Sequence, residues 1–147
     1  MNGSILRVSE ALSLALHATA YLASGNQHPR RVKEIARRIQ ASEAHLSKVL
    51  QALTRAGILK ALRGPKGGYS LAKKPEEITL LEIYEVIHGP LKEQKCLYER
   101  PLCGGDNCIL GDLISQVTQL VRHHLRHTTL EMVKDVITEN LGNTQKK

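Results

Sequence analysis

The sequence contains no Trp or Phe and only four Tyr among its 147 residues. Folds that bind single-stranded nucleic acid stack bases on exposed aromatic rings, so the shortage of rings argues against that class. Three Cys cannot all pair within one chain, which disfavours a secreted disulfide framework. The 41% of hydrophobic residues must therefore build an aliphatic core, enough for one compact domain with a projecting element.

Acidic residues are nearly missing from the stretch between Arg30 and Lys74. It holds twelve Lys or Arg and only Glu34 and Glu43, a charge of +10, whereas the whole chain carries +7 and the remainder therefore −3. Positive charge concentrated in this way favours binding to a polyanion, because neutralised phosphates release counterions. We interpret the stretch as a nucleic-acid interface; a merely solvated basic face is the alternative.

Long apolar runs are also missing. The apolar segment at residues 11–23 is interrupted by three polar residues and is shorter than the roughly 20 residues that cross a bilayer. Glu10 stands where a signal peptide would carry positive charge. The sequence therefore predicts a buried first helix over residues 8–23, in a cytoplasmic protein without a membrane partner.

Two short helices separated by a tight turn follow the first helix. Apolar residues recur at helical spacing over Val32–Ile39 and again over residues 43–56, with Ser42 as the N-cap and Gly57 as the terminator of the second helix. Two helices around the turn at Ala41 and Ser42 are typical of a helix-turn-helix.

The next segment predicts a β-hairpin. Residues 58–62 and 69–72 have the composition of strands, and the linking sequence Arg63-Gly64-Pro65-Lys66-Gly67-Gly68 is incompatible with a helix. It also lacks the spacing of a phosphate-binding P-loop. The predicted fold class is mainly α, a winged helix-turn-helix over residues 1–90 with a small β-hairpin wing and a long C-terminal dimerisation helix.

In such a fold the second short helix lies in the major groove and the wing reaches the minor groove. We expect Ser47 and Lys48 to meet base edges, Arg63 and Lys66 to enter the minor groove, and Gly67 to allow close backbone approach to the DNA. The predicted DNA-binding residues are Arg30, Ala44, His45, Ser47, Lys48, Arg55, Arg63, Lys66 and Gly67.

Another helix is predicted over residues 78–88, capped by Thr79. Residues 109–141 then predict one helix of roughly 45 Å, whose apolar stripe is too long for a small domain to cover. We therefore expect a two-fold homodimer on a pseudo-palindromic operator, with residues 142–147 as a flexible tail. The stripe is Leu110, Leu113 or Ile114, Val117, Val121, Leu125, Met132, Val133, Val136 and Ile137.

A loop over residues 91–108 contains Cys96, Cys103 and Cys108, spaced C-x6-C-x4-C. Unconnected thiols are one interpretation, although free Cys is uncommon in polar, Gly-rich loops. A zinc site is a second interpretation, although the CxxC pair usual in structural zinc sites is missing. An iron–sulfur cluster is a third interpretation, and it suits the wide, uneven Cys spacing better. A Cys-dependent enzyme is a remote alternative; no residue set resembles a triad, so we expect no enzyme.

Nearly the whole chain resembles the IscR/NsrR-type winged-helix iron–sulfur regulators (the Rrf-two family). The most specific match is RGPKGGYSLA at residues 63–72, joined by HLSKVLQAL at 45–53, AGIL at 56–59, AYLA at 20–23 and GGDNC at 104–108. The resemblance implies a dimeric bacterial transcription regulator, often a repressor, whose DNA affinity depends on a 2Fe-2S or 4Fe-4S cluster held by the three Cys.

The chain departs from that family at two places. The family commonly has five residues in each gap between its Cys, and where some members carry a His after the last Cys this chain has Gly111, followed by Asp112. Other members use the first helix of the partner subunit, where Ser13 matches, with Glu10 and His17 one turn to either side. The resemblance thus implies the partner's Glu10 or the partner's His17 as a further ligand, then Asp112. A cluster-free or zinc-binding regulator acting through a thiol switch or a partner protein is the alternative.

Overall fold

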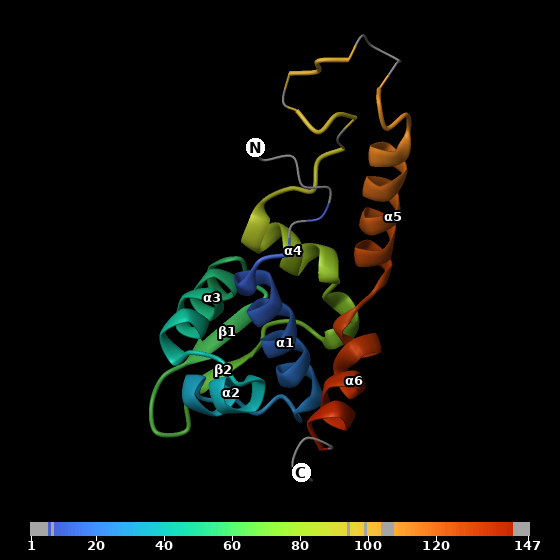
Figure 1. Cartoon of the computed structure of the whole chain (residues 1–147). Coiled ribbons are helices and arrows are strands. Elements are labelled where there is room, and N and C mark those ends of the chain that lie inside the picture. The colour runs from blue at the N-terminus through green and yellow to red at the C-terminus, as the bar shows by residue number, and fades with distance from the viewer. Residues whose placement is uncertain (1–5, 7, 94, 99, 104–107, 143–147) are drawn as a thin grey trace.

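The structure is a computed structural model that describes residues 6, 8–93, 95–98, 100–103 and 108–142. It is mainly helical, with one two-stranded antiparallel hairpin, and has an arm that projects from the helical domain (Figure 1). Within the described residues, no helix combines the length and apolarity needed to cross a bilayer. In chain order the elements are α1 (Glu10–Ser24), α2 (Val32–Ile39), α3 (Glu43–Arg55), β1 (Leu59–Leu62), β2 (Gly68–Leu71), a 3-10 turn (Pro75–Glu77), α4 (Leu80–His88), α5 (Leu113–His127) and α6 (Leu130–Gly142).

The α1 helix forms the centre of the domain and packs against α2, α3, α4 and α6. Ala15 and Ala18 are fully buried, and such small side chains let neighbouring helices approach closely. The buried hydroxyl of Thr19 donates to the carbonyl of Ala15 at 2.8 Å, which satisfies its hydrogen bond within the helix. The helix begins at Glu10 because the Ser9 hydroxyl accepts from the Leu12 amide at 3.1 Å and caps it.

The α2 and α3 helices confirm the predicted helix-turn-helix. The α2 helix has the predicted bounds and ends where Gln40 adopts a left-handed φ of 55°. The Ser42 hydroxyl accepts from the His45 amide at 3.4 Å, so it caps α3 as predicted. One face of α3 enters the core through four buried residues, Leu46, Val49, Leu50 and Leu53.

The wing pairs β1 with β2 from Leu59 opposite Leu71 to Leu62 opposite Gly68. A third segment joins it, because Arg30 and Tyr69 exchange both backbone hydrogen bonds, at 2.9 and 2.8 Å. Gly67 is buried, and a Cβ on it would lie 2.2 Å from the Leu62 carbonyl oxygen. The absence of a Cβ at Gly67 therefore allows the hairpin to close on itself, and its approach to DNA stays a prediction.

The Thr79 cap predicted for α4 is confirmed as a full capping box. The Glu82 carboxylate accepts from the Thr79 amide at 2.8 Å, and the Thr79 hydroxyl accepts from the Glu82 amide at 3.2 Å. Burial raises the pKa of Glu82, but hydrogen bonds from Thr79 and Lys73 outweigh it and hold the pKa below its ordinary value. The cap is therefore charged at neutral pH and links the chain after the wing to α4.

The predicted single helix over residues 109–141 is wrong, because the structure divides it into α5 and α6 at Thr128 and Thr129. At this break the Thr128 carbonyl accepts from the Leu80 amide at 2.9 Å, and the Leu130 amide donates to the Ile78 carbonyl at 3.0 Å. These bonds pair the chain with the segment before α4 instead of continuing the helix. Leu130 then becomes fully buried and α6 packs on α1. Of the predicted stripe on α6, Val133 packs against the core, while Met132 and Val136 remain exposed.

Candidate nucleic-acid interface

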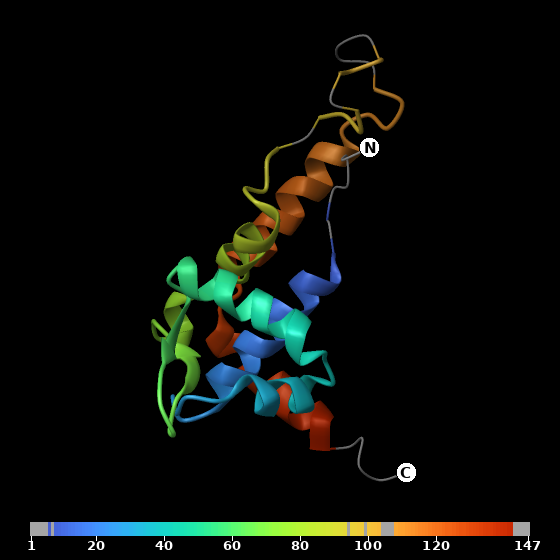
Figure 2. The same cartoon turned by 90° about the vertical axis from the view of Figure 1, so that its left-hand side faces the viewer.

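The exposed face of α3 carries the residues predicted to meet the major groove. Ala44, Lys48 and Arg55 are exposed, while His45 and Ser47 are half-buried. The Gln51 amide donates to the Ser47 hydroxyl at 3.4 Å, which adds an exposed polar group that the sequence analysis did not select. Figure 2 shows that α3, α2 and the hairpin lie on the same side of the molecule.

The hairpin tip places two predicted DNA contacts in solvent. Arg63 and Lys66 are both exposed, and the tip between them is held by a hydrogen bond that Arg31 donates to the Pro65 carbonyl. Arg31 was not among the predicted contacts, although its position directly before α2 in the basic stretch could have drawn attention to it. The bond fixes the wing relative to α2, so the two elements present their charges together.

Arg30 lies differently from the other predicted contacts. Its guanidinium stacks 4.5 Å above the Tyr21 ring, donates to the Tyr21 hydroxyl at 2.8 Å and pairs with Glu34. Only 26% of its side chain is exposed. These contacts give Arg30 a packing role, and its predicted contact with DNA stays a prediction.

The three candidates for a further ligand, Glu10, His17 and Asp112, have different surroundings. The Glu10 carboxylate lies 3.3 Å from Nδ1 of His45 in the same chain, which sets it beside the first turn of α3. The His17 ring hydrogen-bonds to the Ser13 carbonyl at 2.7 Å and lines a small apolar cavity of about 140 Å³ between α1 and α6. Asp112 occupies the N-cap position of α5 without a side-chain cap bond.

The cysteine arm, residues 91–112, begins at a segment fixed to α5. Leu91 is buried and its carbonyl accepts from Arg122. The Glu93 carboxylate accepts from Ser115 at 3.4 Å and from Gln119 at 3.3 Å. The arm lies at the end of α5 that points away from α2 and the hairpin (Figure 1).

Cys96, Cys103 and Cys108 are free, half-buried thiols on this arm. They are the donor type that both zinc and iron–sulfur clusters take, so the residues fit such a group by chemistry. Within the part of the chain that the structure describes, no three Cys, His, Asp or Glu side chains are gathered in metal-binding geometry. Residues 104–107, which include the matched Gly-Gly-Asp-Asn, lie outside the described residues.

A helix-turn-helix followed by a basic hairpin on the same side defines a winged-helix DNA-binding protein. The model of the Rrf2 family, described as an iron-dependent transcriptional regulator, matches residues 8–135. The chain therefore belongs to the Rrf2 family of transcriptional regulators, which is not a family of enzymes.

Individual relatives agree with this assignment. A predicted HTH-type transcriptional regulator of Aquifex aeolicus is 33% identical over 132 residues, which cover 88% of this chain and 90% of that protein. IscR of Aliivibrio salmonicida is 26% identical over 94% of this chain and 79% of its own length. The solved structure of CymR, the global cysteine regulator of Bacillus subtilis, matches with a TM-score of 0.75 and 28% identity, covering 89% of this chain and 98% of that one.

Proposed function

We propose that the chain acts in the bacterial cytoplasm as a homodimeric regulator that binds a pseudo-palindromic duplex operator. The observation that carries the proposal is that α3 and the hairpin lie on the same side of the molecule (Figure 2). Lys48 on α3 and Arg63 and Lys66 at the hairpin tip are all exposed. In a winged helix this side faces the duplex. Ser47 and Lys48 then meet base edges in the major groove, with Ala44, His45 and Arg55 around them, while the wing bases enter the minor groove.

The dimer contact that we propose lies on the outer face of α5. Its inner face packs on α4, where Val121 and Leu125 meet a cluster that includes Leu12, Leu81 and Tyr84. Ile114 and Thr118 of the same helix are also buried. Its outer face leaves Leu113 and Leu120 50% and 69% exposed, one turn either side of Val117. An apolar stripe on a projecting helix is covered most economically by the same stripe of a second copy, which gives two-fold symmetry. Half-sites would then be spaced by whole turns of DNA.

We also propose that Cys96, Cys103 and Cys108 hold an iron–sulfur cluster, of 2Fe-2S or 4Fe-4S type, that controls operator affinity. The free state of the thiols and the family's description as iron-dependent support this. A bound cluster would supply a group whose oxidation or loss can be sensed. The contacts of Leu91 and Glu93 with α5 connect the arm to the proposed dimer helix. Loss of the cluster would change the spacing of the two α3 helices only if the arm makes different contacts with and without the cluster.

The fourth position of the cluster is proposed for the partner's Glu10 or the partner's His17, and next for Asp112. The alternative function is a regulator of the same DNA mode that binds zinc or no metal and acts through a thiol switch or a partner protein. The structural similarity to CymR, a cysteine regulator, supports keeping that alternative. Metal analysis of anaerobically purified protein separates the two.

Replacing Arg63 with alanine tests the wing contact. Arg63 is exposed at the hairpin tip and has no described partner, so its loss removes a DNA contact with little effect on folding. Operator binding should weaken by about 1–3 kcal/mol in an anisotropy titration at physiological salt. Lys92→Ala, which removes an exposed base outside the basic stretch, is the matched control and should bind as wild type. Equal affinity of Arg63→Ala and wild type would reject the wing as a DNA contact.

A further inference from the structure

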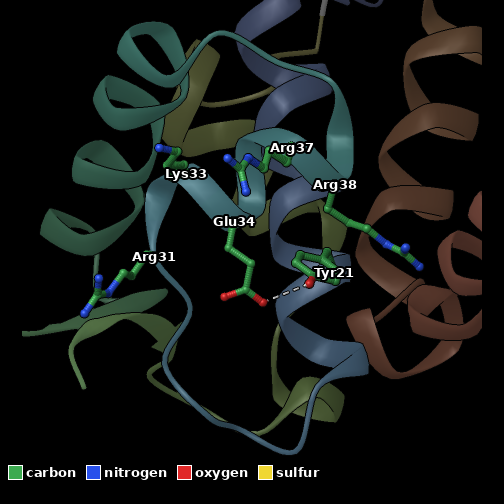
Figure 3. A pocket seen from close by; sticks show the side chains of 6 residues that line it. All are labelled: Tyr21, Arg31, Lys33, Glu34, Arg37 and Arg38. Atoms are coloured by element: carbon green, nitrogen blue, oxygen red, sulfur yellow. Dashed lines mark hydrogen bonds between the residues drawn. The ribbon is translucent and has the colours of Figure 1, made fainter. Parts of the chain in front are cut away.

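The outer face of α2 carries a hollow that we call the α2 pocket. Its volume is about 420 Å³, and its lining comprises one tyrosine from α1 and five charged residues at or in α2 (Figure 3). Four of the charged residues are basic and one is acidic. The full lining is Tyr21, Arg31, Lys33, Glu34, Arg37 and Arg38.

The single acid in the α2 pocket is already neutralised. The Glu34 carboxylate pairs with Arg30, which does not line the pocket, and accepts from the Tyr21 hydroxyl at 3.2 Å. Among the described residues no acidic side chain pairs with Lys33, Arg37 or Arg38. The pocket therefore concentrates uncompensated positive charge, which a bound anion would stabilise.

One guanidinium in the α2 pocket also has an unused donor. Nε of Arg38 is buried and has no hydrogen-bond partner among the described residues, and the Arg38 guanidinium lies 5.8 Å from the centre of the Tyr21 ring. A buried donor without a partner costs on the order of 1–3 kcal/mol, so such groups usually meet a ligand or water. Guanidinium groups bind phosphate through paired N–H donors, which makes a phosphate the best-matched anion.

The position of the α2 pocket connects it to the proposed DNA face. Arg31, one of the residues that line the pocket, donates to the Pro65 carbonyl at the hairpin tip, so the pocket lies next to the wing. In a helix-turn-helix bound to DNA, the first helix crosses the sugar–phosphate backbone while the second lies in the groove. The α2 helix is that first helix, and it lies on the same side as α3 and the hairpin (Figure 2).

We propose that the α2 pocket is a phosphate-binding site that receives the backbone of the duplex beside the recognition helix. The inference rests on the proposed function and extends the contact set to Lys33, Arg37 and Arg38. Phosphate contacts carry no sequence information, so this site would add affinity to every duplex and fix the orientation of α3 in the groove.

The test uses the full-length protein with Lys33→Gln and Arg37→Gln combined, because both side chains are exposed and their loss leaves the core intact. The slope of log K against log salt should become shallower by about 3.6, close to 0.9 for each of the four phosphate contacts that the two protomers lose. The loss should be the same on the operator and on an unrelated duplex. Lys146→Gln combined with Lys147→Gln removes two charges outside the basic stretch and the cysteine arm, so it is the matched control and should keep the wild-type slope. Arg38→Gln, checked for an unchanged unfolding midpoint, should make the slope shallower by about 1.8, because each protomer loses one contact.

The outcomes separate this proposal from the one on which it rests. A steep wild-type slope together with an unchanged slope in the Lys33/Arg37 variant overturns the α2 pocket as a DNA site and leaves the proposed function standing. The second experiment is a calorimetric titration of DNA-free wild-type protein with inorganic phosphate at fixed ionic strength. Saturable phosphate binding that the variant loses, with no change in the duplex slope, assigns the pocket to a free anion and also overturns the proposal. No duplex binding by wild type overturns both.

Discussion

Replacing Gly68 with alanine should detach the wing and reduce operator binding at least as strongly as the loss of Arg63. Gly68 has a φ of 149°, and a Cβ on it would lie 2.4 Å from the Arg30 carbonyl oxygen. The chain would have to break the paired bonds between Arg30 and Tyr69, each worth about 0.5–1.5 kcal/mol. Backbone strain adds on the order of 1–3 kcal/mol. Urea unfolding and an anisotropy titration would measure both losses.

Gly64→Ala is the matched control for that experiment. Gly64 also has a positive φ, of 105°, but a Cβ on it would meet no atom within 4 Å. Gly64→Ala should therefore lose only the stability that backbone strain costs, without a collision between a Cβ and neighbouring atoms. It should keep most of its DNA affinity. Wild-type stability and affinity in Gly68→Ala would contradict the attachment of the wing through Arg30 and Tyr69.

The second large effect concerns the thiols of the cysteine arm. Changing any one of Cys96, Cys103 or Cys108 to serine should remove the iron, the sulfide and the visible charge-transfer absorption from anaerobically purified protein. A cluster needs thiolate ligands, and the chain has only these three Cys, so no other thiol can replace one that is lost. Iron and sulfide counts with an anaerobic spectrum measure the loss, and sedimentation should still give the dimer mass, because the outer face of α5 is unchanged.

Lys95→Ser supplies the control, because it alters an exposed neighbour of Cys96 without removing a thiol. It should retain the wild-type colour and iron content. Colourless wild-type protein with stoichiometric zinc would instead support the zinc alternative, and wild-type protein free of metal would support the thiol switch. Iron retained at the wild-type level in all three serine variants would reject the Cys ligands altogether.

The helix-turn-helix, the hairpin and their caps were predictable because local chemistry specifies them. The side chains of Ser42 and Thr79 cap the first turns of α3 and α4, so they indicate where these helices begin. The bounds of α2 follow from apolar residues that recur at helical spacing. The break between α5 and α6 was not predictable in this way. Helical periodicity continues through Thr128 and Thr129, and only backbone bonds to the distant residues Ile78 and Leu80 end the helix there.

In the candidate site, too, only the features that local sequence specifies were predictable. Exposure of Lys48, Arg63 and Lys66 follows from their place on a helix face and a turn, which the sequence specifies. The inward position of Arg30 depends on the packing of Tyr21 from another helix, and no local pattern reports such a contact. The α2 pocket likewise arises only when α1 and α2 are brought together, although the bases that line it were visible as the outer face of a helix.

The proposed function depends on ionic contact between the basic face and duplex DNA. A titration of wild-type binding to a double-stranded oligonucleotide over increasing salt tests this most directly. With α3, the wing and the α2 pocket of both protomers engaged, we expect six or more phosphate contacts and a slope of log K against log salt of about −5 or steeper. A slope near zero on every duplex would contradict the account, whatever metal the cysteine arm holds.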